Sequence, residues 1–210
     1  MGKISEKLLD KYRDLNVQDT WWDSVYEDWV NKLIDLGMNL TSGDISFSGF
    51  WSQGDGASFE CRFVLDTFLE KHGLAEKYPA ALYWAKQEQL DARMVRFSRS
   101  RSHQYCVHAE LEDNAYVDSQ AAAEGDVREA VAEAMFNTLA TELEGLEEDI
   151  NDTCRGYMQE IYSALEQEYE HLTSDETITE YLTENEIFDD DEDDDGDEET
   201  HNEEIEALEM

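Results

Sequence analysis

The sequence has little of what marks secreted, membrane or disulfide-bonded proteins. It contains one proline and three cysteines, and no apolar run approaches the roughly 20 residues of a membrane helix. Cys61, Cys106 and Cys154 are widely spaced without a CxxC pair, which is typical of reduced thiols in the cytoplasm. The opening MGKISEKLLDKYRD lacks the apolar core of a signal peptide. We therefore expect a cytoplasmic protein that does not interact with membranes.

Patterns that carry catalysis or hold cofactors are also scarce. The five histidines have no zinc-ligand spacing, and neither a GxGxxG nor a lysine-ended phosphate loop is present. Glu168 and His171 lack the second Glu-x-x-His pair that a di-iron site needs. The run from Asp191 resembles half of a calcium loop, but its twelfth position is Asn202 instead of glutamate. We expect no enzyme activity, no metal site and no cofactor.

Positive charge is scarce in one half of the chain only. The sequence has 15 Lys and Arg against 53 Asp and Glu, a formal net charge of −38. Residues 1–110 hold 17 acidic and 13 basic residues, whereas residues 111–210 hold 36 acidic and 2 basic ones. The N-terminal half is therefore ordinary and the C-terminal half is a polyanion.

Apolar spacing in the N-terminal half predicts several helices. The clearest begins at Thr20, which forms a capping-box pattern with Asp23, and ends at Gly37, a residue type that caps helix C-termini. Its apolar stripe, which includes Trp22 and Trp29, is expected to pack in the core. Further helices are expected at 3–15, 64–72 and 79–91.

Alternating apolar residues predict two β-hairpins in the same half. Segments 44–51 and 57–65 are joined by the glycine-rich turn 52–56. Segments 93–99 and 104–112 form the second pair. The N-terminal part is thus predicted to be an α+β body with a small antiparallel sheet of four strands packed with helices.

The C-terminal half reads as a long acidic helical segment followed by a disordered acidic tail. Apolar residues recur at steps of three and four over 127–172, as one helix or as two with a break near 145–153, and a weaker helical patch covers 175–187. Segment 189–199 has ten acids in eleven residues and is expected to be disordered. We divide the chain into a body at 1–115, an acidic helical region at 124–187 and a tail at 188–210.

The density of acids suggests mimicry of a DNA backbone. As a helix, 127–172 spans about 69 Å and carries roughly one net negative charge per 7 Å, against one per about 1.7 Å for duplex DNA. Two such helices, paired through the apolar stripe in a homodimer, come closer to the charge density of DNA. Alternatively, the same stripe packs on the body. The residues expected to contact a host DNA-binding protein are Glu142, Glu144, Glu147, Glu148, Asp149 and Asp152.

Two other interpretations of the charge remain open. In the first interpretation the acids serve only to keep the protein soluble. Against it, the negative charge continues over a long structured segment, and solubility needs far fewer charges. Alternatively, the cluster Arg93, Arg96, Arg99 and Arg101, with Phe97 and Tyr105 nearby, binds nucleic acid as an antitoxin-like or regulatory protein. Against that, a charge of −38 repels DNA, so we expect no direct binding of nucleic acid and expect these arginines to pair with the acidic segment.

The segment ISFSGFWSQGDGASFE at 45–60 resembles a motif of small phage-encoded proteins that are often labelled antitoxin-like. Within it, Trp51, Gln53 and Asp55 are the candidates for a second partner contact. The acidic half is similar in composition to phage DNA-mimic inhibitors, such as a phage-encoded inhibitor of DNA gyrase. This resemblance implies an inhibitor that acts in the host cytoplasm on gyrase or, next, on restriction enzymes or nucleases.

Overall fold

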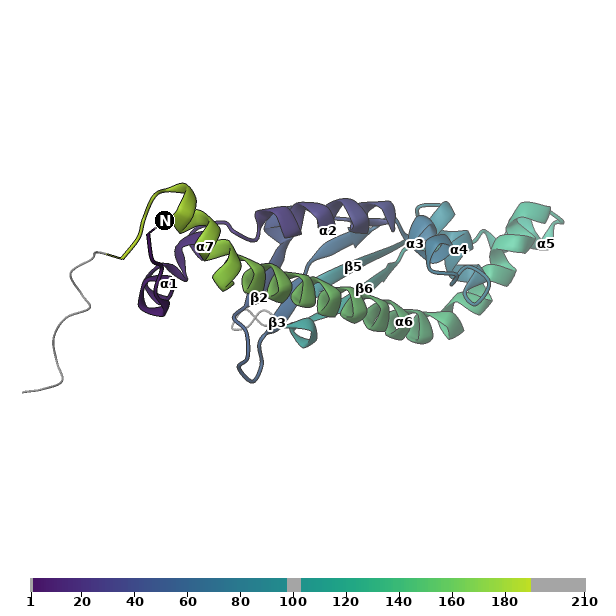
Figure 1. The fold of residues 1–210 in the computed structure, drawn as a ribbon. Coiled ribbons are helices and arrows are strands. Elements are labelled where there is room, and N and C mark those ends of the chain that lie inside the picture. The colour runs from purple at the N-terminus through teal and green to yellow at the C-terminus, as the bar shows by residue number, and fades with distance from the viewer. Residues whose placement is uncertain (1, 98–102, 190–210) are drawn as a thin grey trace, which may run out of the picture. The chain divides into compact units, whose positions relative to one another are not determined.

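The computed structural model describes residues 2–97 and 103–189, and it confirms the α+β class (Figure 1). The helices, including short 3-10 turns (η), and the strands are α1 Glu6–Tyr12, η1 Leu15–Val17, α2 Asp23–Asp35, β1 Met38–Asn39, η2 Ser42–Asp44, β2 Ile45–Ser48, β3 Gly56–Phe59, β4 Cys61–Phe63, α3 Leu65–Lys71, α4 Pro79–Lys86, β5 Leu90–Arg96, η3 Gln104–Cys106, β6 Val107–Asp113, α5 Ser119–Ala123, α6 Val127–Leu172 and α7 Asp175–Glu184.

Helix α2 ends as predicted but begins differently. Gly37 adopts φ +85°, and a Cβ there would meet the Phe68 backbone nitrogen at 2.6 Å, so only glycine fits. The capping box predicted at Thr20 is wrong, because Trp22 occupies the N-cap and no side chain caps the helix. A capping box forms instead at Thr41, whose backbone N–H donates to Asp44 Oδ2 at 2.8 Å.

The strand pairing differs from the two separate hairpins that the sequence predicted. The four-stranded antiparallel sheet has the order β1-β4-β5-β6, while β2 and β3 form a separate two-stranded ribbon with Ile45 opposite Phe59. The segment predicted as one strand at 57–65 breaks at Glu60, so that β4 leaves the ribbon and pairs with β1 and β5. Pairing of β5 with β6 matches the second predicted hairpin, with Arg93 opposite Glu110.

Helix α4 starts at Pro79 as predicted and is shorter than expected. It ends at Lys86, since Glu88 turns the chain with φ +55° and Leu90 already begins β5. Helix α3 matches its predicted range, and Gly73 follows it with φ +69°.

Helix α6 is continuous from Val127 to Leu172. Gly145, where a break was considered, instead gives room to Tyr78, because a Cβ there would lie 3.1 Å from the Tyr78 hydroxyl. The apolar stripe of α6 is buried in the same core as the sheet and α2, α3 and α4. Its buried members are Leu139, Leu146, Ile150, Cys154, Met158, Ile161 and Leu165.

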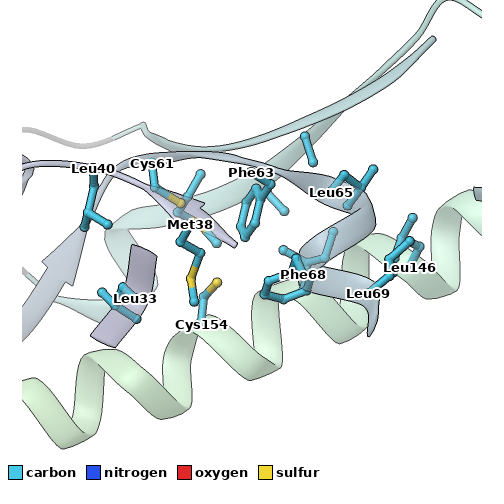
Figure 2. Close-up of a cluster of buried hydrophobic side chains, with 14 of the residues drawn as sticks. Leu33, Met38, Leu40, Cys61, Phe63, Leu65, Phe68, Leu69, Leu146 and Cys154 are labelled. Carbon is cyan, nitrogen blue, oxygen red and sulfur yellow. The ribbon is translucent and has the colours of Figure 1, made fainter. Parts of the chain in front are cut away.

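Figure 2 shows this core around Met38, with Cys61 from β4 above it and Cys154 from α6 below. Both cysteines are buried and free. Burial raises the pKa of Cys61 to about 12 and raises that of Cys154 as well, so neither thiol ionises readily near neutral pH. The sulfur atoms therefore serve as apolar packing groups.

The chain divides into two compact units. One comprises residues 20–169 and includes both the sheet and most of α6, so the acidic helix shares a core with the body. The other joins the described residues 2–19 with 170–189, where the Arg13 guanidinium pairs with Asp175 at 2.9 Å and donates to the Thr173 carbonyl. No helix in the described part of the chain combines the length and the apolar character needed to span a membrane.

Because α6 completes the core, truncating its buried side chains will destabilise the whole unit. Ile150→Ala and Ile161→Ala, at fully buried positions, are each expected to lower the free energy of unfolding by about 2–5 kcal/mol in chemical denaturation. The control Val127→Ala lies on the same helix at a side chain that is 76% exposed, and should change it by less than about 0.5 kcal/mol. Equal, small effects at all three positions would contradict this account of the core.

Candidate functional site

The exposed face of α6 carries an acidic strip, which we define as Glu144, Glu147, Glu148 and Asp152. All four are exposed. Glu144, Glu148 and Asp152 follow one another at intervals of four residues, which places them on one face of the helix opposite the buried stripe. Along this face Glu144, Glu148 and Asp152 follow one another about every 6 Å of helix axis, against one charge per about 3.4 Å of a single DNA strand.

Little positive charge offsets the strip within the described residues. Asp152 pairs with Arg155 on the same helix at 3.0 Å, and no described cation pairs with Glu144, Glu147 or Glu148. Like charges four residues apart on a helix oppose folding by a few tenths of a kcal/mol per pair. The strip therefore presents carboxylates that neighbouring side chains leave largely uncompensated.

Glu142, which the sequence grouped with the strip, is instead part of the core. Its side chain is only 8% exposed, and its carboxylate accepts hydrogen bonds from the backbone N–H groups of Ala80 at 3.2 Å and Ala81 at 2.8 Å. These are the donors left unpaired at the start of α4, since Pro79 has no N–H. Glu142 thus caps α4 from a distant helix and cannot contact a partner.

Asp149 is also engaged inside the protein. Its Oδ2 accepts a hydrogen bond from Lys77 Nζ at 2.6 Å and another from the Tyr78 hydroxyl at 2.8 Å. The bond from Lys77 lowers the pKa of Asp149, against the opposing effect of burial. Asp149 therefore fastens the segment before α4 to α6, and its charge is neutralised locally.

The described part of the arginine cluster is already paired. Arg93 bonds to Glu110 across the sheet at 2.9 Å, and Arg96 bonds to Glu60 at 2.9 Å and to the hydroxyls of Ser46 and Ser58. Arg93 was expected to pair with the acidic segment, and that expectation is wrong, since its partner is Glu110 of β6. Arg99 and Arg101 lie outside the described residues, as do the tail from residue 190 onward and its half calcium loop.

The turn between β2 and β3 holds the secondary candidates. Asp55 shapes the turn, since its Oδ2 accepts a hydrogen bond from the Ser52 backbone N–H at 2.8 Å. Gln53 is exposed. Trp51 is 68% exposed and adopts φ +65°, a left-handed conformation that is rare for a bulky residue and often marks a functional turn.

Trp51 belongs to an aromatic cluster that the sequence did not predict. The cluster comprises seven rings with neighbouring centroids 5.3–6.2 Å apart, namely Trp21, Trp22, Phe47, Phe50, Trp51, Tyr162 and Tyr169. None of the seven is fully buried. The sequence assigned Trp22 to the core by its helical spacing, but no pattern linked it to Tyr162 and Tyr169, which come from the far end of α6.

The predicted homodimer surface is largely unavailable, because Leu139 to Leu165 are buried within the chain. Only the first turns of α6 leave apolar side chains exposed, at Val127, Val131 and Phe136. Among the described residues, no group of three or more His, Cys, Asp or Glu side chains is arranged to hold a metal ion.

The fold and site define an α+β protein with a long helix that is apolar on one face and acidic on the other. The chain belongs to the family described as a domain of unknown function, DUF8835, whose model matches residues 21–175. The match covers the sheet, α6 and the aromatic cluster. No curated protein and no solved structure matches the chain.

Removing the Glu142 carboxylate should destabilise the fold, because this carboxylate caps α4 from within the core. Glu142→Ala leaves two buried backbone donors without a partner and is expected to lower the free energy of unfolding by about 1–3 kcal/mol. Glu144→Ala, two residues away and exposed, should leave it within about 0.5 kcal/mol of the parent. Thermal or denaturant unfolding measures both; an unchanged stability for Glu142→Ala would show that the cap contributes nothing.

Proposed function

We propose that the chain is a binding protein that inhibits a DNA-binding enzyme by laying the acidic strip of α6 in the groove that normally holds a phosphate backbone. The observation that carries the proposal is the exposed series Glu144, Glu147, Glu148 and Asp152, on a helix whose opposite face is buried in the core. Action on a host enzyme in the cytoplasm is part of the same proposal.

Rigidity supports this function over simple solubility. The buried stripe fixes α6 against the sheet, so the backbone that carries the carboxylates is ordered before a partner arrives and binding loses little backbone entropy. Their spacing of about 6 Å along the exposed face, with Glu147 beside it, lets them meet lysine and arginine side chains that otherwise bind phosphates. A solubilising surface needs neither the order nor the local density.

The choice of target rests on resemblance. Similarity to phage DNA-mimic inhibitors makes DNA gyrase the first enzyme to assay, followed by restriction enzymes and nucleases. Direct binding of nucleic acid is a weaker second function, since Arg93 and Arg96 are held in ion pairs with Glu110 and Glu60.

The acidic strip is tested by neutralising it without touching the core. The quadruple variant Glu144→Gln, Glu147→Gln, Glu148→Gln and Asp152→Asn should keep its fold, because all four side chains are exposed. In gyrase supercoiling, restriction cleavage and nuclease assays, its inhibition should be more than tenfold weaker than that of the parent, equivalent to over about 1.4 kcal/mol. Raising the salt concentration should weaken the parent more than the variant.

A matched control removes the same four charges elsewhere. Glu27→Gln, Glu76→Gln, Glu88→Gln and Asp28→Asn are all exposed and off the strip, so this variant should inhibit nearly as well as the parent. The proposal is overturned if both quadruple variants lose inhibition equally, if neither does at low salt, or if the parent inhibits no enzyme in the panel.

A further inference from the structure

The aromatic cluster forms a partly exposed surface at the C-terminal end of α6, on the face of this helix that carries the acidic strip. Trp51 lies at its outer edge, with its ring centroid 5.6 Å from Phe50 and 5.7 Å from Tyr169. Clusters of tryptophan and tyrosine that stay half-exposed are enriched at the energetic centres of protein interfaces. Aromatic side chains that only fill a core need not be exposed to solvent, so core packing alone does not account for this cluster.

Two carboxylates lie beside this aromatic surface. Burial raises the pKa of Tyr162, and the nearby charges of Asp55 and Glu166 raise it further, while a hydrogen bond with the Trp51 backbone opposes them. Asp55 comes from the β2–β3 turn, and Glu166 lies one turn beyond Tyr162 on α6. The surface therefore combines aromatic faces with negative charge, the two features that together attract an organic cation.

Helix α6 already holds two cations in this way. Lys32 Nζ lies 3.8 Å from the ring centroid of Trp29 and 3.1 Å from the carboxylate of Glu160. The guanidinium of Arg155 lies 5.2 Å from the ring centroid of Tyr105 and 3.0 Å from Asp152. In each case a carboxylate of α6 and an aromatic ring share one cationic side chain.

Tyr162 and Glu166, four residues apart on α6, form a similar pair of ring and carboxylate next to the Trp51 backbone, and no cation from the described part of the chain occupies it. Among those residues, no lysine or arginine pairs with Glu166 or lies over the ring of Trp51. Trp51 is 68% exposed, so its ring is accessible from solution. We propose that the surface formed by Trp51, Tyr162 and Glu166 binds a lysine or arginine side chain of a partner protein.

This site extends the acidic strip along one line of α6. Glu148, Asp152, Arg155, Gln159, Tyr162 and Glu166 follow one another at steps of three and four residues, which keeps them on one side of the helix. The inference deepens the proposed function, since a basic groove that receives the strip also carries the cation that fills the aromatic site. The strip supplies charge attraction, and Trp51 supplies an anchor that salt screens less.

A short peptide tests the site without any enzyme. The probe is a capped pentapeptide with two arginines between glycines, and its control replaces both arginines by citrulline, which keeps the planar shape and removes the charge. Fluorine NMR of the full chain labelled with 5-fluorotryptophan reports the five tryptophans separately. The arginine peptide should shift the signals of Trp51 and Trp21, and leave that of the buried Trp84 unchanged. The citrulline peptide should shift none of them.

Matched variants locate the binding surface. Trp51→Ala should weaken binding of the peptide at least tenfold, read from the Trp21 signal. Glu166→Gln removes one partly exposed charge pair and should weaken it by about threefold, equivalent to about 0.7 kcal/mol. Phe97→Ala, at another exposed aromatic residue, and Glu76→Gln, at an exposed carboxylate away from the strip, should bind as the parent does. Thermal unfolding checks that Trp51→Ala remains folded.

The inference is overturned if the two peptides bind alike, if neither binds, or if Trp51→Ala binds as tightly as the parent. Its failure is separable from that of the proposed function. If the parent does not bind the arginine peptide, but the quadruple strip variant inhibits the enzyme less than the parent does, then the proposed function stands and the aromatic anchor is absent.

Discussion

The burial of one face of α6 is the constraint on which the rest of the molecule depends. Seven apolar side chains from Leu139 to Leu165 close the core over the sheet, and the helix in return is fixed along that length. A helix that carries so many like charges would be a poor helix alone, because adjacent carboxylates repel each other. Packing of the apolar stripe outweighs that repulsion, since each large buried side chain contributes about 1.5–3 kcal/mol.

The acids of α6 therefore divide into two kinds by where they face. Glu142 and Asp149 point towards the body, where they cap α4 and hold Lys77 and Tyr78. Glu144 and Glu148 point away and meet solvent. The direction in which a carboxylate faces around the helix thus decides whether it stabilises the fold or is available to a partner. The number of acidic residues in the sequence does not reveal this.

The sequence predicted the elements better than their partnerships. Helix α6, the start of α4 at Pro79 and the β5–β6 pairing follow from local periodicity and were predicted. The switch of strand partners at Glu60 was missed, because β1 is two residues long and has no alternation to detect. The roles of Glu142 and Tyr162 depend on contacts between segments distant in sequence, so no spacing rule identifies them.

Hydrogen exchange of the backbone amides, measured by NMR on the full chain, tests most directly whether α6 is an integral part of the core. If it is, amides from 146 to 165 will open with a free energy within about 1 kcal/mol of global unfolding, as those of β5 and β6 do. If those amides exchange at a free energy several kcal/mol lower while the sheet stays protected, α6 is a separable helix. The acidic strip would then lack the rigid support on which its proposed function rests.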